Sequence, residues 1–227
     1  MGDFAAVWQG LDWSVLTDAL LFVIPILICL TIHELAHGAA AYALGDDTAK
    51  RMGRLTLNPI RHIDPVGFLM LLIARFGWAK PVPVDMRNFR RPKVGMAITA
   101  LAGPMSNFLL AMLILLFQVP ILRLFAGGGA GATVAQMIWG TATISVLLGV
   151  FNLLPIPPLD GSKILFAILP DKQHNWLMRY ERYGMILLFA LIWFAMQEGG
   201  PFRMFMNTVL DWFINVMATP SAFLFVR

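Results

Sequence analysis

The sequence has few charged residues and a single cysteine, and both shortages narrow what the protein can be. Only 13% of its 227 residues are charged, whereas 59% are hydrophobic. Soluble domains carry about 25% charged residues, so the composition excludes an ordinary soluble domain and indicates a membrane protein. Because Cys29 is the only cysteine, no intrachain disulfide can form.

The N-terminal region lacks basic residues. No Lys or Arg precedes Lys50, so we expect no cleavable signal peptide with a basic leading region. Position 6 is not Ser or Thr, which argues against N-myristoylation. Internal repeats and low-complexity tracts are missing too. We therefore expect residues 1–227 to form one membrane-embedded domain, with a core at about 15–170 and C-terminal helices at about 176–227.

Hydrophobic residues occur in blocks that are long enough to cross a bilayer, which takes about 20 residues of helix. Strong spans are predicted at 15–44, 94–118 and 133–154, and weaker ones at 183–197 and 203–226. The apolar run at 66–74 is too short to cross and is interpreted as re-entrant or interfacial. The predicted fold class is an all-α polytopic membrane protein with about four to five transmembrane helices.

Basic residues concentrate in the connection between the first two spans. Residues 1–44 contain none, whereas residues 45–93 contain ten. The positive-inside rule places this connection in the cytoplasm and the N-terminus outside. We interpret the cluster as an orientation signal with some attraction to anionic lipid, and we expect no nucleic-acid partner.

The segment HELAH, residues 33–37, lies inside the first apolar span and matches the pattern H-E-x-x-H. Two histidines four residues apart lie on one helix face, about 5–6 Å from each other, and can bind one zinc ion. Glu34 stays free to act as a general base toward water. The alternative is two histidines in a core helix by chance, but ionisable groups at membrane depth are costly and usually functional.

A catalytic zinc site needs three protein ligands, and two residues are candidates for the third. Cys29 lies one turn before His33 on nearly the same face, although a cysteine at this depth is more often a packing residue. Asp160 follows a proline-rich segment at the cytoplasmic end of the third span. It could instead cap the helix that follows, and spacing alone does not separate the two roles. Topology favours Asp160 as the ligand, because His37 also lies near the cytoplasmic end of its span.

The two motifs HELAHG and NLLPIPPLDG, in this order on successive strong spans, make the sequence resemble the site-2 protease family of intramembrane zinc metalloproteases. The likeness continues through NPIRHIDPVG, GWAKPVPV and ALAGPMSNF and so covers roughly residues 20–170. It is closest to the compact bacterial type without PDZ or CBS domains.

The resemblance implies that His33, His37 and Asp160 bind one zinc ion and that Glu34 is the general base. It also suggests that Asn152 holds the substrate backbone or the developing oxyanion. Residues 77–84 would form a re-entrant, strand-like edge between the first two spans that presents substrate to the zinc.

The activity implied is hydrolysis of peptide bonds in membrane-spanning segments near the cytoplasmic face of a bacterial inner membrane. The partners would be a transmembrane protein or peptide substrate and the lipid bilayer, and a homo-oligomer is a further hypothesis. Two alternatives remain: a membrane metal transporter or sensor that uses the same His/His/Asp site, and a binder of membrane segments that does not cut them. Glu34→Gln separates the first alternative from hydrolysis, because transport does not need a general base.

Two further polar features fall in apolar surroundings. Asn107 follows several small residues, so it either forms an interhelical hydrogen bond or acts near the active site on substrate or oxyanion. A stripe with a spacing of four marks the C-terminal segment: Arg203, Asn207, Asp211 and Asn215. It indicates either an amphipathic helix in the interface or a span that turns its polar face toward the bundle, a water path or another subunit. In the second case Arg203 and Asp211 could pair through Asn207.

Overall fold

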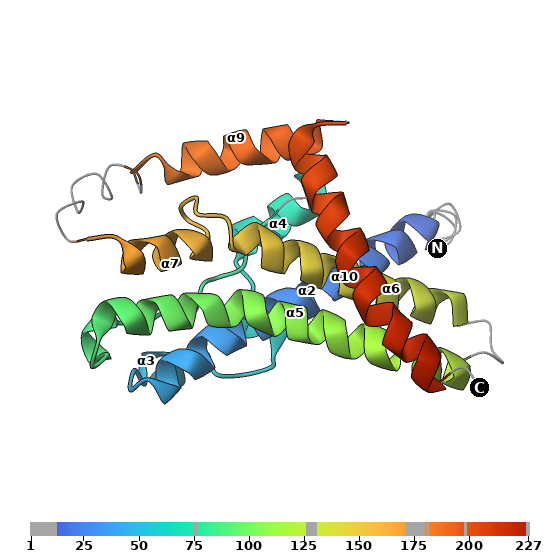
Figure 1. Ribbon diagram of the computed structural model, residues 1–227, viewed down its shortest axis with the longest axis horizontal. Coiled ribbons are helices and arrows are strands. Elements are labelled where there is room, and N and C mark those ends of the chain that lie inside the picture. Colours follow the sequence, from blue (N-terminus) through green and yellow to red (C-terminus); the bar gives the residue numbers. More distant parts are fainter. Residues whose placement is uncertain are drawn as a thin grey trace, which may run out of the picture.

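The protein is built around three long apolar helices. The computed structural model describes residues 13–74, 77–125, 131–170, 180, 182–197 and 199–225. Its long helices are α2 (Trp13–Ala43), α5 (Pro92–Phe125) and α6 (Gly131–Asn152) (Figure 1). Each is long and apolar enough to cross a membrane, α2 over Leu21–Ala43. The three strong spans predicted from the sequence are therefore confirmed, and α5 is longer than predicted at both ends.

Shorter helices fill the connections and the C-terminal part. They are α3 (Thr48–Arg51), η1 (Pro59–His62), α4 (Pro65–Ala74), η2 (Met86–Asn88), α7 (Asp160–Ile168), α9 (Gly184–Met196) and α10 (Pro201–Phe225). The apolar α9 has 13 residues, about 20 Å of helix, which is shorter than the hydrocarbon core. No strand occurs within the described ranges. The all-α prediction is confirmed.

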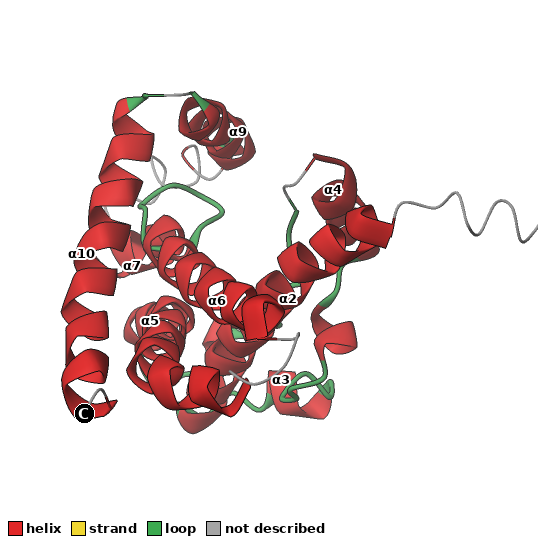
Figure 2. Ribbon diagram, turned by 90° about the vertical axis from the view of Figure 1, so that its right-hand side faces the viewer, coloured by secondary structure: helices red, strands yellow, loops and turns green. Residues whose placement is uncertain are grey.

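The long helices pack side by side, and α7 and α10 pack against them. α5 contacts α2, α6 and α7, and α10 crosses α5 and α6. Figure 2 shows α10 and α4 on opposite sides of this bundle. Small residues of α6, such as Ala142, Ser145 and Gly149, are buried, and they allow neighbouring helices to approach closely.

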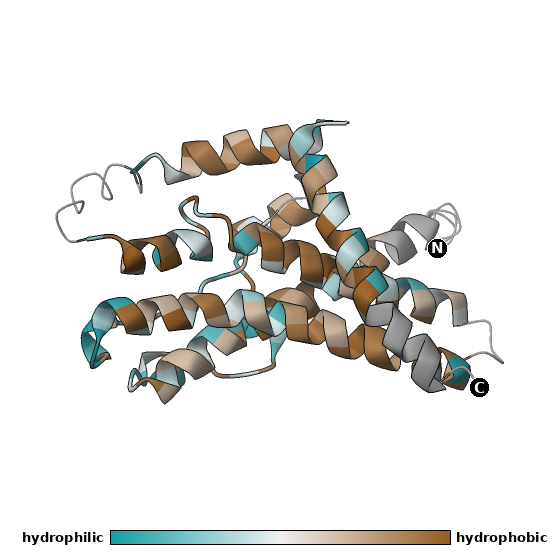
Figure 3. Ribbon diagram, viewed as in Figure 1, coloured by the Kyte–Doolittle hydropathy of each residue, from teal (hydrophilic) through white to brown (hydrophobic). Residues whose placement is uncertain are grey.

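The distribution of polarity suits a bilayer rather than water. Figure 3 shows mostly hydrophobic residues along the long helices and hydrophilic residues around α3 and the adjacent end of α5. Large apolar side chains of α5, including Ile98, Leu101 and Leu109, are exposed, whereas His33 and Asn107 are buried. Polar groups inside and apolar groups outside are expected where lipid surrounds the chain. The protein is an integral membrane protein.

The connection between α2 and α5 contains the segment that was predicted to be strand-like. α4 is a helix of 10 residues, about 15 Å long and too short to span, which fits a re-entrant or interfacial piece. After it, residues 77–85 form neither helix nor strand, and their one isolated bridge joins Ala79 to Ile63. The segment is anchored mainly through side chains from other parts of the chain.

The polar stripe of α10 points away from the bundle. Arg203, Asn207, Asp211 and Asn215 are all exposed, while Phe213 of the same helix packs on Phe108 of α5, with ring centroids 5.9 Å apart. Among the described residues no ion pair joins Arg203 to Asp211. The stripe therefore does not line the interior of the single chain.

Candidate metal centre

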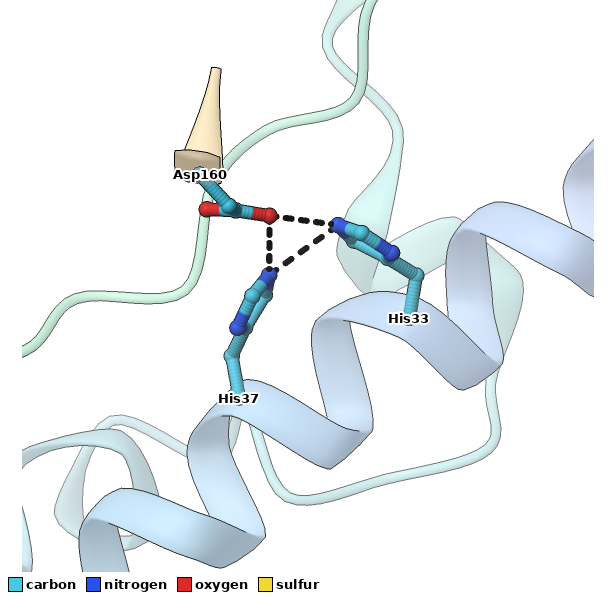
Figure 4. Close-up of side chains that lie close together, drawn as sticks. All are labelled: His33, His37 and Asp160. Carbon is cyan, nitrogen blue, oxygen red and sulfur yellow. Dashed lines mark hydrogen bonds and ion pairs between the residues drawn. The ribbon is translucent and has the colours of Figure 1, made fainter. Parts of the chain in front are cut away.

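Two helices bring three ligand-type side chains to one point. His33 and His37 extend from α2, and Asp160 is the first residue of α7 (Figure 4). The Nε2 atoms of the histidines are 3.0 Å apart, and the Oδ2 atom of Asp160 lies 3.1 Å from His33 Nε2 and 3.0 Å from His37 Nε2. All three residues are buried. The structure thus joins the three residues that the sequence nominated as ligands.

The separations fit a tetrahedral metal ion. With metal–ligand bonds of about 2.0–2.1 Å, two ligands of a tetrahedral zinc lie about 3.3 Å apart. The separations of 3.0–3.1 Å are close to this value. Two imidazole nitrogens and one carboxylate oxygen form a donor set that suits zinc with one open position.

The ring of His37 is oriented by the backbone of α5. Its Nδ1 atom lies 2.7 Å from the carbonyl oxygen of Thr99. A carbonyl only accepts hydrogen bonds, so Nδ1 carries the proton and Nε2 offers its lone pair to the cluster. A hydrogen bond of this kind on the far nitrogen is the usual support of a metal-ligating histidine.

Asp160 is delivered by an irregular segment. Residues 153–159, which include three prolines, leave α6 without continuing its helix, as predicted from the missing backbone donors. Gly161 is required for close approach, because a Cβ there would collide with the carbonyl oxygens of Leu153 and Leu154. The N-cap of α7 is Leu159, and no side-chain cap hydrogen bond is formed. The interpretation of Asp160 as a helix cap is therefore wrong.

Lys163 holds the second oxygen of Asp160, a role that the sequence analysis did not assign. Its Nζ atom lies 3.0 Å from Asp160 Oδ1, three residues along α7. The pairing leaves Oδ2 for the histidines and fixes the carboxylate plane. The i, i+3 spacing of an acid and a lysine at a helix start was the available signal.

Glu34, the predicted general base, has a different partner. Its Oε2 atom accepts a hydrogen bond from the backbone N–H of Val82, with an N···O distance of 2.7 Å. The neighbours of Val82 in sequence are Pro81 and Pro83, which have no N–H. Val82 is thus the sole backbone donor among these three residues.

Arg54 and Asp46 fix the irregular segment of residues 77–85 on either side of Val82. The guanidinium of Arg54 donates to the carbonyl oxygens of Lys80 and Pro81. The buried carboxylate of Asp46 accepts from the backbone N–H of Asp85 at 2.8 Å. Neither residue was singled out from the sequence, because contacts about 26 to 39 residues apart leave no local pattern.

The remaining sequence candidates lie elsewhere. Cys29 packs between α2 and α6, with Sγ 3.2 Å from Ser145 Oγ and 3.5 Å from the Thr141 carbonyl oxygen, and it is not in the three-residue cluster. Asn152 donates from Nδ2 to the Leu148 carbonyl oxygen of its own helix. Asn107 is fully buried beside His33 Nδ1, on the side of the ring that faces away from Asp160.

The fold and the cluster define a class: a polytopic helical membrane protein with a buried His-His-Asp site of metal-binding type. Residues 119–195 match the model of peptidase family M50. The chain is 41% identical over 173 residues to YwhC of Bacillus subtilis (strain 168), which is named as a zinc metalloprotease, and the alignment covers 74% of this chain and 78% of that protein.

Two proteins of Mycobacterium tuberculosis (strain H37Rv) are also similar. Rip2 is 33% identical over 174 residues, 73% of this chain and 63% of its own length. Rip3 is 31% identical over 203 residues, 86% of this chain and 44% of its own length. Their names, like that of YwhC, give the zinc metalloprotease activity as an inference. No solved structure was found to match.

The chain belongs to peptidase family M50. The resemblance to the site-2 protease family is thereby confirmed.

Proposed function

We propose that the protein is a membrane zinc metalloprotease that hydrolyses peptide bonds in membrane-spanning segments near the cytoplasmic face. The observation that carries the proposal is the convergence of His33, His37 and Asp160, whose ligand atoms lie 3.0–3.1 Å from one another. Glu34 is adjacent to His33 on the same helix. M50 membership and the names of the relatives support the zinc and the protease activity.

The three clustered residues would hold one zinc ion, and Glu34 would remain outside the ligand set. Bound zinc would supply Lewis-acid polarisation of the scissile carbonyl and of the attacking water. Within the described part of the chain, Glu34 Oε1 accepts no hydrogen bond, whereas Oε2 accepts one from Val82 N–H. We assign to the carboxylate the removal of a proton from the attacking water and its transfer to the leaving amine. Asn152 Nδ2 donates one of its two hydrogens to the Leu148 carbonyl oxygen, and the other would serve the oxyanion.

The proposed substrate is a single membrane-spanning segment. Its backbone must unwind locally, because a helix engages its amides in its own hydrogen bonds. His37 lies six residues before the end of α2, about 9 Å along the helix, so water needs to reach only a shallow depth. The ten basic residues of 45–93 support a cytoplasmic position for this end and an external N-terminus, in a bacterial inner membrane.

We extend the proposal to the whole chain as one protease domain. The core at about 15–170 contains the cluster, and α9 and α10 belong to the C-terminal part at about 176–227, of which residues 176–179, 181, 198, 226 and 227 lie outside the described residues. α10 packs on α5 and α6, which supports a single unit. A second copy of the chain remains a proposed partner.

The decisive experiment compares wild type with Glu34→Gln. Both are purified from cells in mild detergent, and the peptides that co-purify are identified by mass spectrometry. We expect the variant to retain a defined set of membrane peptides that wild type clears. The captured peptides are then added to both proteins in proteoliposomes, where wild type should cleave them and Glu34→Gln should not.

Zinc dependence is tested in the same proteoliposomes. A chelator such as 1,10-phenanthroline should abolish cleavage by wild type, and added zinc should restore it. If wild type and Glu34→Gln both bind zinc and both leave every membrane peptide uncut, the protease proposal fails. Zinc flux that survives Glu34→Gln would favour the transporter alternative.

A further inference from the structure

One stripe of α5 forms the wall behind the two histidines. Thr99, Gly103 and Asn107 are spaced by four residues and lie on one helix face. All three are buried, and each meets the candidate ligands. This wall is not part of the three-residue cluster, and no sequence motif considered above assigned it to the metal.

Gly103 leaves room for the imidazole rings. A Cβ at this position would collide with Cε1 and Nε2 of His37 and lie 2.7 Å from Cε1 of His33. Any larger residue would push both rings off α5. The ring orientation therefore depends on direct contact between α2 and the backbone of α5.

Thr99 and Asn107 face the outer nitrogens of the two rings, one turn above and one turn below Gly103. The Thr99 carbonyl oxygen contacts His37 Nδ1, and the side-chain amide of Asn107 contacts His33 Nδ1 at 3.1 Å. The contacts are equivalent in position, yet their chemistry differs. A carbonyl can only accept, whereas an amide can present either its oxygen or its nitrogen.

We infer that Asn107 is a positioning residue, which presents its side-chain oxygen to His33 and so reserves His33 Nε2 for the metal. The inference deepens the proposed function and rests on it. If Asn107 donated to His33 Nδ1, the ring proton would sit on Nε2 and point at Asp160 Oδ2, in the place of a metal bond. If its Oδ1 accepts from Nδ1–H, the Nε2 lone pair faces the cluster, as it already does in His37.

Turning the amide so that its oxygen faces His33 breaks no hydrogen bond to any other described residue. With nitrogen placed toward His33, Asn107 Oδ1 is buried with no hydrogen-bond partner in the described part of the chain. The oxygen and nitrogen of such an amide have nearly the same shape, so neighbouring groups decide which end faces which way. Ligation by both Nε2 atoms requires the oxygen to face His33.

The alternative role of Asn107 is a purely structural interhelical hydrogen bond, and substitutions separate the two roles. Asn107→Leu keeps the approximate volume but offers no acceptor, whereas Asn107→Asp offers only acceptors. Gln118→Leu serves as the matched control, because Gln118 is another buried amide of α5, 11 residues further along the helix. If Asn107 had a purely structural role, Asn107→Leu and Gln118→Leu would change zinc affinity to a similar extent.

Zinc affinity of the purified full-length protein, measured by competition with a chromogenic chelator, is the main readout. We expect Asn107→Leu to weaken zinc binding by about 10- to 100-fold, and Asn107→Asp and Gln118→Leu to stay within a few-fold of wild type. Equal affinity of wild type and Asn107→Leu, or equal losses in Asn107→Leu and Asn107→Asp, would overturn the inference. Failure of wild type to bind zinc would overturn both the inference and the proposed function.

A second measurement needs no substitution and covers the case in which Asn107→Leu does not fold. Nitrogen-15 NMR of histidine-labelled wild type with zinc distinguishes a protonated Nδ1 from a protonated Nε2. We expect His33, assigned through a His33→Gln sample, to carry its proton on Nδ1. Zinc bound through His33 Nδ1, with the proton on Nε2, would overturn the role of Asn107 while leaving the proposed protease intact.

Discussion

The carboxylate of Glu34 on α2 accepts a hydrogen bond from the backbone N–H of Val82, a residue 48 positions away, at an N···O distance of 2.7 Å. The donor residue belongs to the irregular segment of residues 77–85 and has a proline on each side of it in sequence. The candidate general base is therefore oriented by the same segment that the site-2 protease resemblance assigns to substrate presentation. If substrate binds along this segment, as that resemblance implies, substrate binding and alignment of the base depend on the same backbone.

Replacing Val82 by Pro tests this link. The change removes the N–H that Glu34 accepts, so we expect the rate of peptide cleavage to fall roughly 10- to 100-fold, as for a misplaced catalytic group. Zinc affinity should stay near that of wild type, because no ligand atom is touched. Both are measured in proteoliposomes with a captured substrate peptide. Val84→Pro is the matched control, since Val84 N–H donates no hydrogen bond to any described residue. Equal losses in the two variants would refute the role of the Val82 N–H.

Asp46 supplies a pH-dependent anchor for the same segment. Burial raises the pKa of this carboxyl, but hydrogen bonds from Thr48, from the Asn88 side chain and from the backbone N–H of Asp85 outweigh burial and hold the pKa below its ordinary value. A lowered folded-state pKa means that the ionised form stabilises the fold above the ordinary pKa of about 3.9 and that this stabilisation is lost as pH falls below it.

We therefore expect Asp46→Asn to destabilise the protein by about 1–3 kcal/mol at pH 7. Thermal unfolding in detergent, followed by circular dichroism between pH 3 and pH 7, measures the effect. The difference between wild type and variant should shrink as the pH falls below about 4. A difference that is constant over this range would show that the charge of Asp46 is not what stabilises the anchor.

Lys163 should strengthen metal binding through Asp160. Its Nζ atom holds Asp160 Oδ1 at 3.0 Å, while Oδ2 faces the histidines. We expect Lys163→Met to weaken zinc binding by about tenfold, the lower end of the range for residues that orient ligands, because the lysine is partly exposed. Lys163→Arg should retain most of the affinity. Zinc competition in detergent measures both, and an unaffected Lys163→Met would mean that α7 alone fixes the carboxylate.

The stripe of α10 yields a prediction about assembly. Asp211 is exposed and forms no ion pair with Arg203 among the described residues. Asp211→Ala should change the unfolding free energy of the solubilised single chain by less than about 0.5 kcal/mol. If a second copy covers the stripe, the variant should instead shift the oligomer size seen by light scattering. Strong destabilisation at constant size would mean that Asp211 has a partner within the chain.

The sequence was sufficient for the features that depend on local pattern. Apolar length predicted α2, α5 and α6, and the interval of four placed His33 and His37 on one helix face. Asp160 was nominated by topology and by the resemblance. The choice between ligand and helix cap could not be made from spacing, because both roles use an acid at the start of a helix.

The sequence by itself determined the membrane class, the helix that carries the histidines and the chemistry of the ligand set, since these follow from composition and helical period. Only the tertiary structure decided that Cys29 packs on α6 and that Asp160 completes the cluster. It also decided which groups orient the histidines. The backbone carbonyl of Thr99 contacts His37, and the side-chain amide of Asn107 reaches His33 because α5 packs on α2. A backbone carbonyl has no sequence signature, so a partner of this kind emerges only when two helices are packed together.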